Sequence, residues 1–262
     1  MVKSVNKTWK NFSKYRFLLI ELVKKEIKLK YRRSYLGILW TLLEPILTTA
    51  VLTFVFGSMK ENKDPQFPVY IMSGRLLYTF FADSTKAAMK SIRTNSAMIK
   101  KVYVPKYIYP FSAVLSNYVI FLISLIVLFF TAIVFKVEPT IYLLNTILPM
   151  FFLLVLALGI GLILATMAVF FRDLEYLWGV ALMMILYTSA IFYKVSTLKL
   201  GDKTWMLKLN PLYVIIDNFR SAIFGTPLNH TSLLLTVIYS FGTLIIGILL
   251  FYRKQDKFIL NI

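Results

Sequence analysis

Residues 141–171 read IYLLNTILPMFFLLVLALGIGLILATMAVFF, a stretch with no charged side chain. A helix needs about 20 predominantly apolar residues to cross the roughly 30 Å hydrocarbon core of a bilayer, so this stretch predicts a transmembrane helix. It exceeds that minimum, and Pro149 is the expected position of a break, as is Pro110 in a second long segment. Five further segments complete a prediction of six transmembrane helices: 36–56, 70–92, 107–135, 176–195 and 231–252.

The overall composition agrees with an all-α integral membrane protein. Of the 262 residues, 58% are hydrophobic and 16% are charged, whereas soluble domains carry roughly 45–50% apolar and about 25% charged residues. A net charge of +18 would suggest a nucleic-acid partner in a soluble protein. The hydrophobicity excludes that partner and leaves membrane topology as the reason for the charge. With no cysteine and a single histidine, we expect no disulfide, metal or other cofactor in this chain.

The distribution of Lys and Arg predicts the orientation in the membrane. With six spans both termini lie on one side, and 21 of the 30 basic residues then fall on that side. Because basic residues accumulate in cytoplasmic loops, we expect a multi-pass protein of the cell membrane with both termini in the cytoplasm. The chain then consists of a cytoplasmic N-terminus (1–34), a six-span membrane domain (35–252) and a cytoplasmic tail (253–262).

Residues 15–34 are too rich in Lys and Arg to span a bilayer, but Ile20, Val23, Ile27 and Tyr31 recur at helical spacing. The segment predicts an amphipathic helix on the cytoplasmic membrane surface, with its basic face toward anionic lipid head groups. Two roles stay open for this helix. It is either a topological anchor or a contact for a partner or a lipid-linked substrate.

The sequence lacks the residues that ATP binding or catalysis would require. No phosphate-binding loop of the form Gly-x-x-x-x-Gly-Lys-Ser/Thr occurs. With Lys86, Lys90 and Lys194 counted with the flanking loops, the ionisable residues within the predicted spans are few, namely Glu44, Arg75 and Asp83. Glu44 precedes Pro45, so its carboxylate either contacts a substrate, as intramembrane carboxylates often do, or caps backbone groups that the proline frees. The absence of clustered carboxylates or basic phosphate clamps at one depth argues against an enzyme.

Three stretches of the chain are informative when they are taken together: ELVKKEIKLKYRRSYLGILWTLLEPIL (21–47), NSAMIKKVYVPKYIYP (95–110) and LNPLYVIIDNFRSAIFG (209–225). This set resembles the permeases of type-2 ABC exporters for polysaccharides and teichoic acids. The segments SGRLLYTFF (73–81) and FRDLEYLWG (171–179) also fit, so the resemblance covers nearly the whole chain. One departure follows the fifth predicted span, where the family often has two prolines and this chain has Ala190 and Lys194.

The resemblance implies a half-transporter that works as a homodimer with two copies of a separate cytosolic ABC ATPase, on which ATP and Mg²⁺ act. The implied substrate is a lipid-linked polysaccharide or a teichoic-acid-type polymer that moves from the cytoplasm to the outside. Two alternatives stay open. One is an ABC permease for a small hydrophobic compound such as a drug or haem, and the other is an ATP-independent membrane channel or scaffold.

The cytoplasmic segment after the second predicted span is the candidate contact with the ATPase. Met98, Ile99, Val102 and Tyr103 form an apolar face on a short predicted helix that ends at Pro105, and such a helix suits docking into a groove. The predicted coupling residues are Asn95, Met98, Ile99, Lys100, Lys101, Val102, Tyr103 and Pro105. The alternative is a surface helix that rests on lipid, with its lysines enforcing topology.

Residues 196–228 are predicted to lie outside, yet they are too apolar for a free loop and too interrupted to span. We expect short re-entrant or interfacial helices there, which the resemblance identifies as an outer gate. Asn210 is predicted to cap a helix that begins at Pro211, and Asp217 to pair with Arg220. The predicted gate residues are Asn210, Pro211, Asp217, Phe219 and Arg220. Simple interfacial anchoring is the alternative.

Aromatic side chains are abundant, and most are expected to face lipid or the core. Sugars also present C–H faces that stack on aromatic rings, so some rings are candidates for a sugar conduit. The candidate translocation-path residues are Trp40, Glu44, Tyr78, Phe81, Tyr187, Phe192 and Tyr193. Separately, Gly159 and Gly161, with Ala157 and Ala165, predict close helix packing, either within one subunit or between two.

Overall fold

The computed structural model describes residues 2–32, 34–58, 64–102, 104–195 and 205–258. These residues form helices joined by turns and contain no β-strand, which confirms the all-α prediction. The longer helices are α1 (Val2–Tyr31), α2 (Trp40–Ser58), α3 (Phe67–Thr94), α5 (Ile108–Val134), α6 (Ile147–Phe170), α7 (Leu174–Thr188), α9 (Pro211–Ile223) and α10 (His230–Lys254). The short ones are η1 (Gly37–Leu39), α4 (Ser96–Lys101), η2 (Ile141–Thr146), α8 (Trp205–Lys208) and η5 (Gln255–Lys257).

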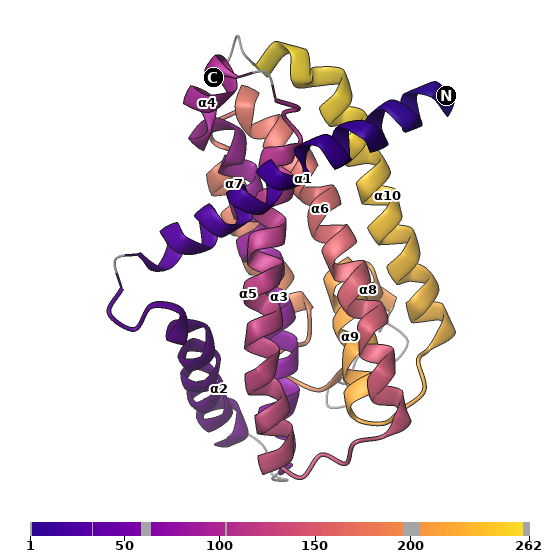
Figure 1. The fold of residues 1–262 in the computed structure, drawn as a ribbon. Helices are drawn as coiled ribbons and strands as arrows, with labels where there is room; N and C mark the ends of the chain where they lie inside the picture. Colours follow the sequence, from indigo (N-terminus) through magenta and orange to yellow (C-terminus); the bar gives the residue numbers. More distant parts are fainter. Residues whose placement is uncertain (1, 33, 59–63, 103, 196–204, 259–262) are drawn as a thin grey trace.

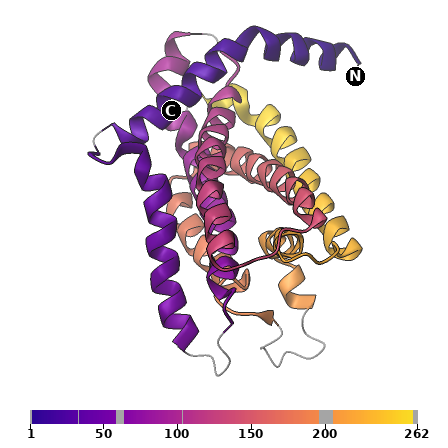
Figure 2. The ribbon, with the colours of Figure 1, turned by 60° about the horizontal axis from the view of Figure 1, so that its bottom comes forward.

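The long helices form an elongated bundle (Figure 1). α3 and α5 run side by side through it, α6 and α10 pack against each other beside them, and α2 stands at the edge against α3 and α5. α1 crosses one end of the bundle, where α4 and the end of α10 also lie, so the first and the last long helix meet this same end of the molecule (Figure 1). Figure 2 shows α2 on one side of the bundle and α8 and α9 on the other.

Four segments of the described chain are long and apolar enough to cross a membrane: Gly37–Gly57, Ile108–Val134, Ile141–Phe170 and His230–Lys257. α3 has 28 residues but carries Arg75, Asp83 and three further basic residues. α7 is apolar but has 15 residues. Each of the six predicted spans thus contains a helix, and four of these segments qualify by length and composition.

The predicted fifth span, 176–195, is shorter than expected because its helix ends at Thr188. The chain turns at Ala190, whose φ of 50° lies outside the right-handed helical region. A proline cannot adopt this φ, since its ring fixes φ near about −65°. The missing proline at this position therefore agrees with the observed turn.

Pro110 and Pro149 do not break their helices, contrary to the prediction. Each is the third residue of its helix, in α5 and α6 respectively. The first N–H groups of a helix have no acceptor within it, so a proline is tolerated there. Pro45 differs because it lies inside α2.

α1 is longer than the predicted segment 15–34 and is fixed to the bundle. It begins at Val2 and ends at Tyr31, and it packs across α5 with Leu19 and Leu22 buried. Ile20 of the predicted apolar stripe points outward instead. The other three residues of that stripe, Val23, Ile27 and Tyr31, are half-buried, so the buried face coincides only in part with the predicted one.

A carboxylate takes part in this docking of α1 on α5. Glu26 accepts hydrogen bonds from the hydroxyl of Ser116 at 2.7 Å and from that of Ser112 at 3.1 Å. Burial raises the pKa of Glu26 above its usual range, and the two hydroxyls and nearby Lys25 offset part of that rise. The contact between α1 and α5 thus includes a group that titrates.

Glycines allow α6 and α10 to approach closely within one chain. A Cβ on Gly159 would lie 2.5 Å from the backbone nitrogen of Leu244, and a Cβ on Gly247 would lie 2.5 Å from the carbonyl oxygen of Gly159. A Cβ on Gly161 would lie 2.9 Å from the Cβ of Ala88 in α3. The predicted small-residue packing is therefore present and lies within the subunit.

Candidate functional site

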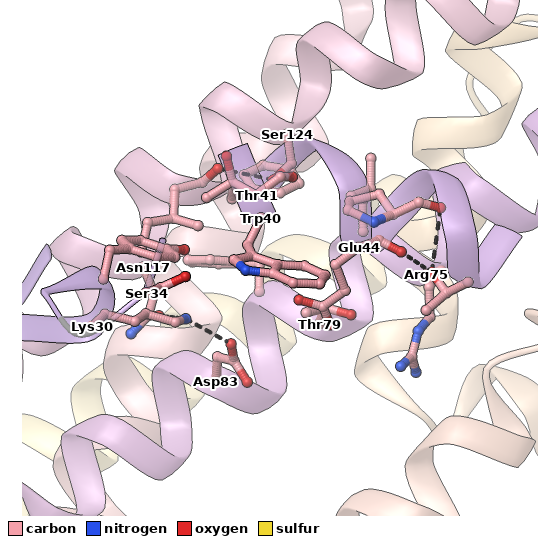
Figure 3. Close-up of a pocket in the computed structure, with 17 residues that line it drawn as sticks. Lys30, Ser34, Trp40, Thr41, Glu44, Arg75, Thr79, Asp83, Asn117 and Ser124 are labelled. Carbon is pink, nitrogen blue, oxygen red and sulfur yellow. Dashed lines mark hydrogen bonds and ion pairs between the residues drawn. The ribbon is translucent and has the colours of Figure 1, made fainter. Parts of the chain in front are cut away.

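A cleft of about 410 Å³ lies between α2 and the α3–α5 pair, next to the end of α1 (Figure 3). Its volume falls in the range of roughly 300–1,000 Å³ that small-molecule sites occupy. The polar lining residues are Lys30, Ser34, Thr41, Glu44, Thr48, Arg75, Thr79, Asp83, Asn117 and Ser124. The indole of Trp40 and the ring of Phe80 contribute apolar surface.

Helical spacing brings these side chains to the cleft. Arg75, Thr79 and Asp83 follow one another at four-residue intervals on α3, and Trp40 and Glu44 do so on α2. Side chains at this interval share one face of a helix. Glu44, Arg75 and Asp83, which the sequence analysis singled out within predicted spans, therefore all line the same cleft.

Lys30 connects α1 to this cleft. Its ammonium nitrogen lies 3.1 Å from a carboxylate oxygen of Asp83 in α3 and 3.3 Å from the amide oxygen of Asn117 in α5. Glu44 and Arg75 form no ion pair with any described residue. The cleft thus contains one ion pair, Lys30 with Asp83. Glu44 and Arg75 have no counter-ion within the described chain.

Ser124 of α5 provides the cap that Pro45 requires. Pro45 has no N–H, so the carbonyl group of Thr41 loses its helical partner. The Ser124 hydroxyl lies 3.1 Å from this carbonyl oxygen and 3.1 Å from that of Ile120 in its own helix, so its single hydrogen is shared between the two acceptors. The alternative in which Glu44 caps the freed backbone is therefore wrong, and its exposed side chain lines the cleft instead.

The other candidate path residues lie away from the cleft. Tyr78, Phe81 and Phe192 are buried in the main hydrophobic core of the chain. Tyr78 donates to the carbonyl oxygen of Leu182 at 3.0 Å. Tyr193 donates to the carbonyl oxygen of Tyr187 at 2.8 Å, and the Tyr187 side chain is exposed. Of the seven candidates, Trp40 and Glu44 line the cleft.

The predicted coupling segment contains a helix, α4, that ends earlier than expected. It stops at Lys101, because Val102 has an extended backbone, so Pro105 does not terminate it. Ile99 is buried in a core cluster, whereas Met98, Val102 and both lysines are exposed. The predicted continuous apolar face is thus divided between the core and the surface. Tyr103 lies outside the described residues, and the Asn95 amide donates to the carbonyl of Ser91 rather than capping α4.

Glu175 joins the start of α7 to the end of α3, close to α4. Its two carboxylate oxygens lie 3.0 Å from the ammonium of Lys90 and 3.2 Å from the guanidinium of Arg93. This residue belongs to the segment 171–179 that carried part of the resemblance. The pairing was not predicted, since nothing in the local sequence pattern identifies the partners.

Asn210 caps α9, as predicted. Its side-chain oxygen accepts from the backbone N–H of Leu212 at 3.0 Å and of Tyr213 at 3.4 Å, and Pro211 occupies the first helical position. Its side-chain nitrogen donates to the hydroxyl of Ser189 at 2.9 Å, which connects α9 to the end of α7. Phe219 is buried in the core. The preceding part of the predicted gate, 196–204, lies outside the described residues.

Arg220 does not pair with Asp217, contrary to the prediction. Its guanidinium donates to the carbonyl oxygens of Ala190 at 2.8 Å and Tyr70 at 2.9 Å, and stacks 3.5 Å from the centre of the Tyr70 ring. A carbonyl oxygen of Ile191 lies at 3.4 Å. Burial lowers the pKa of Arg220 to about 10, so the group stays charged at neutral pH. Backbone carbonyls exposed by the turn at Ala190 outcompete the carboxylate for this cation.

Several cleft residues were not identified from the sequence, and Lys30, Asn117 and Ser124 are among them. Lys30 belongs to a basic stretch in which no single lysine stands out, and the two α5 residues are small polar groups within an apolar run. Among the described residues, no group of three or more His, Asp or Glu side chains is arranged to hold a metal ion.

Comparison with known proteins identifies the family. Residues 18–224 match the family described as "ABC-2 type transporter". The chain is 26% identical over 243 residues to "O-antigen export system permease protein RfbA" of Klebsiella pneumoniae, covering 92% of this chain and 93% of that protein. It is 29% identical over 211 residues to the protein of the same name from Myxococcus xanthus, covering 80% and 81%. It is 22% identical over 243 residues to "Polysialic acid transport protein KpsM" of Escherichia coli, covering 88% and 91%. The chain therefore belongs to the ABC-2 type transporter family.

Proposed function

We propose that this chain is the permease subunit of an ATP-driven exporter that moves a lipid-linked polysaccharide or teichoic-acid-type polymer across the cytoplasmic membrane. The observation that carries the proposal is its family membership, combined with relatives named for O-antigen and polysialic acid export that align along most of its length. The charged cleft supports a transport role, because ionisable groups within membrane helices are commonly functional.

The proposed topology has six crossings, with α3 and α7 as the second and fifth, and both termini in the cytoplasm. The excess of Lys and Arg on one side supports this orientation. The position of α1, α4 and the end of α10 at one end of the bundle supports it too (Figure 1). The helices α8 and α9 then form part of a re-entrant outer gate, held by Arg220 and Asn210.

The proposed assembly is a homodimer with two copies of a cytosolic ABC ATPase that binds ATP and Mg²⁺. α4 is the contact with this ATPase, since it lies at the end of the bundle (Figure 1) and its Met98, Lys100 and Lys101 are exposed. Glu175 then transmits movement of α4 to α7, because it holds α7 against the end of α3 through two ion pairs.

Depletion of the permease in its native cell tests the proposed function. The polyprenyl-linked glycan pool is extracted and analysed by mass spectrometry, with a strain complemented by the wild-type chain as the control. We expect a full-length lipid-linked polymer to accumulate, and its phosphate content separates a teichoic acid from a neutral glycan. An unchanged pool would contradict the proposal and make a small hydrophobic compound the first candidate substrate.

A further inference from the structure

We propose that the cleft between α2, α3 and α5 binds an uncharged sugar ring of the lipid-linked polymer, next to its lipid anchor. This inference rests on the proposed function and adds to it a binding site and the chemical class of its ligand. The site is built from Trp40, Glu44, Arg75, Asp83 and Asn117, which line one continuous space.

The balance of charge in the cleft favours an uncharged ligand. Two cations, Lys30 and Arg75, face two anions, Glu44 and Asp83, and one cation and one anion already form an ion pair. A phosphate placed here would meet two carboxylates. A ligand with many hydroxyl groups avoids this repulsion, because each hydroxyl both donates to carboxylates and accepts from guanidinium or amide groups.

The shape and composition of the cleft also fit a sugar. Trp40 is 42% exposed and lines the cleft, which presents hydroxyl, amide and charged groups together with further apolar side chains such as Leu76 and Phe80. In Figure 3 the labelled polar side chains surround the indole of Trp40. An apolar ring flanked by hydrogen-bonding groups matches a sugar, whose C–H face is apolar and whose edge carries the hydroxyls.

Basic side chains on and next to α1 provide a place for the phosphate of the lipid-linked glycan. Lys25 and Lys28 on α1, and Arg32 directly after it, are exposed and lie outside the cleft. Phosphate groups form strong charge-assisted hydrogen bonds with such side chains. A lipid-linked glycan can therefore keep its phosphate against the basic surface of α1 while its adjacent sugar enters the cleft beside Lys30.

Site-specific photocrosslinking tests this assignment in the full-length protein in native cells. A benzophenone amino acid replaces Glu44 in one variant and Phe54 in a matched control. Phe54 lies on the same helix, is 79% exposed and does not line the cleft. After irradiation, the permease is purified, its glycan is labelled by periodate oxidation, and half of the sample receives mild acid, which splits the bond between sugar and phosphate.

We expect a glycan adduct at position 44 that retains its label after acid, and little or none at position 54. An adduct that loses its label in acid would show contact through the lipid and would overturn the sugar assignment. If no adduct forms at position 44 while depletion still makes the lipid-linked glycan accumulate, the assignment of the binding site is wrong and the proposed function stands. If the pool is also unchanged on depletion, the proposed function fails as well.

Substitutions provide a second, independent measurement. E44Q removes a charge-assisted acceptor, and we expect about tenfold slower appearance of polymer at the cell surface. W40A is expected to slow export and W40F to restore part of it, because phenylalanine keeps a ring face. F54A is the control and should export normally. Normal export by both E44Q and W40A, at unchanged abundance in the membrane, would contradict the proposal.

Discussion

The hydroxyl oxygen of Ser124 lies 3.1 Å from the carbonyl oxygen of Thr41, the acceptor that Pro45 leaves without a helical partner. These residues are 83 positions apart in the sequence. The contact fixes α2 against α5 at the wall of the cleft, where α2 otherwise exposes much of its surface. A proline inside a membrane helix is tolerated when a neighbouring side chain satisfies the freed backbone group, as here.

Replacing Ser124 by Ala is expected to destabilise the protein by about 1 kcal/mol, because the Thr41 carbonyl loses its donor. P45A should rescue S124A, since the new N–H at position 45 supplies that carbonyl from within α2. Thermal unfolding of the four variants of this double-mutant cycle in detergent measures the coupling. Additive effects of the two substitutions would show that Ser124 does not act as the cap.

Alanine at Gly159 or Gly247 is expected to destabilise the α6–α10 contact by about 1–3 kcal/mol, because the added Cβ meets backbone atoms that cannot easily move. Gly242 is the matched control on α10. A Cβ at that position meets no atom within 4 Å, so G242A should be neutral or stabilising by up to about 1 kcal/mol. Equal effects of G242A and G247A on the melting temperature would contradict the close packing.

Substitution of Arg220 by Lys is expected to cost about 2 kcal/mol or more, since an ammonium group cannot reproduce the fork of hydrogen bonds to Tyr70 and Ala190. G74A should act on the same contact, because a Cβ at position 74 would collide with a guanidinium nitrogen of Arg220. Both variants should lose export, and the double variant should lose little more stability than R220K alone. Asp217 makes no such contact, so D217N serves as the control.

Charge reversal at Lys100 and Lys101 is expected to abolish export while the protein stays folded and inserted. Both side chains are exposed on α4, so the change does not disturb the core. Surface polymer and the amount of ATPase that copurifies are the two measurements. The same reversal at Arg253 and Lys254, which are exposed on the tail of α10, is the control. Unchanged export by K100E/K101E would contradict the coupling role of α4.

The docking of α1 on α5 is expected to strengthen as pH falls. Burial raises the pKa of Glu26, so the docked state favours the protonated carboxyl. This contribution is fully present below the ordinary pKa of a glutamate and is lost as pH rises through the raised value. Hydrogen exchange of α1, corrected for the intrinsic rate, should show this dependence.

E26Q should remove most of this pH dependence, because glutamine does not titrate. E21Q should retain it, since Glu21 is exposed and pairs with Lys24 on the same helix. A dependence that persists in E26Q would assign the effect to another group.

Contacts that depend only on residues close together in the sequence were predictable. The cap at Asn210 follows from an Asn–Pro pair before an amphipathic segment, and the geometry depends on neighbouring residues alone. The pairing of Asp217 with Arg220 was predicted from the same kind of local spacing and is wrong, because distant carbonyl groups compete for the guanidinium. Local spacing shows which contacts are possible and not which of them the folded chain selects.

The sequence by itself determined the helical class, the positions of the long helices and the presence of ionisable residues within them. These properties depend on the length of apolar runs and on the need of backbone groups to bond within a helix in lipid. Only the tertiary structure decided that Glu44, Arg75 and Asp83 share one cleft, that Lys30 enters it from α1, and that Ser124 caps the proline of α2. Lys30 and Asp83 are 53 residues apart, and helix packing, which maximises close contact across the whole bundle, brings them together.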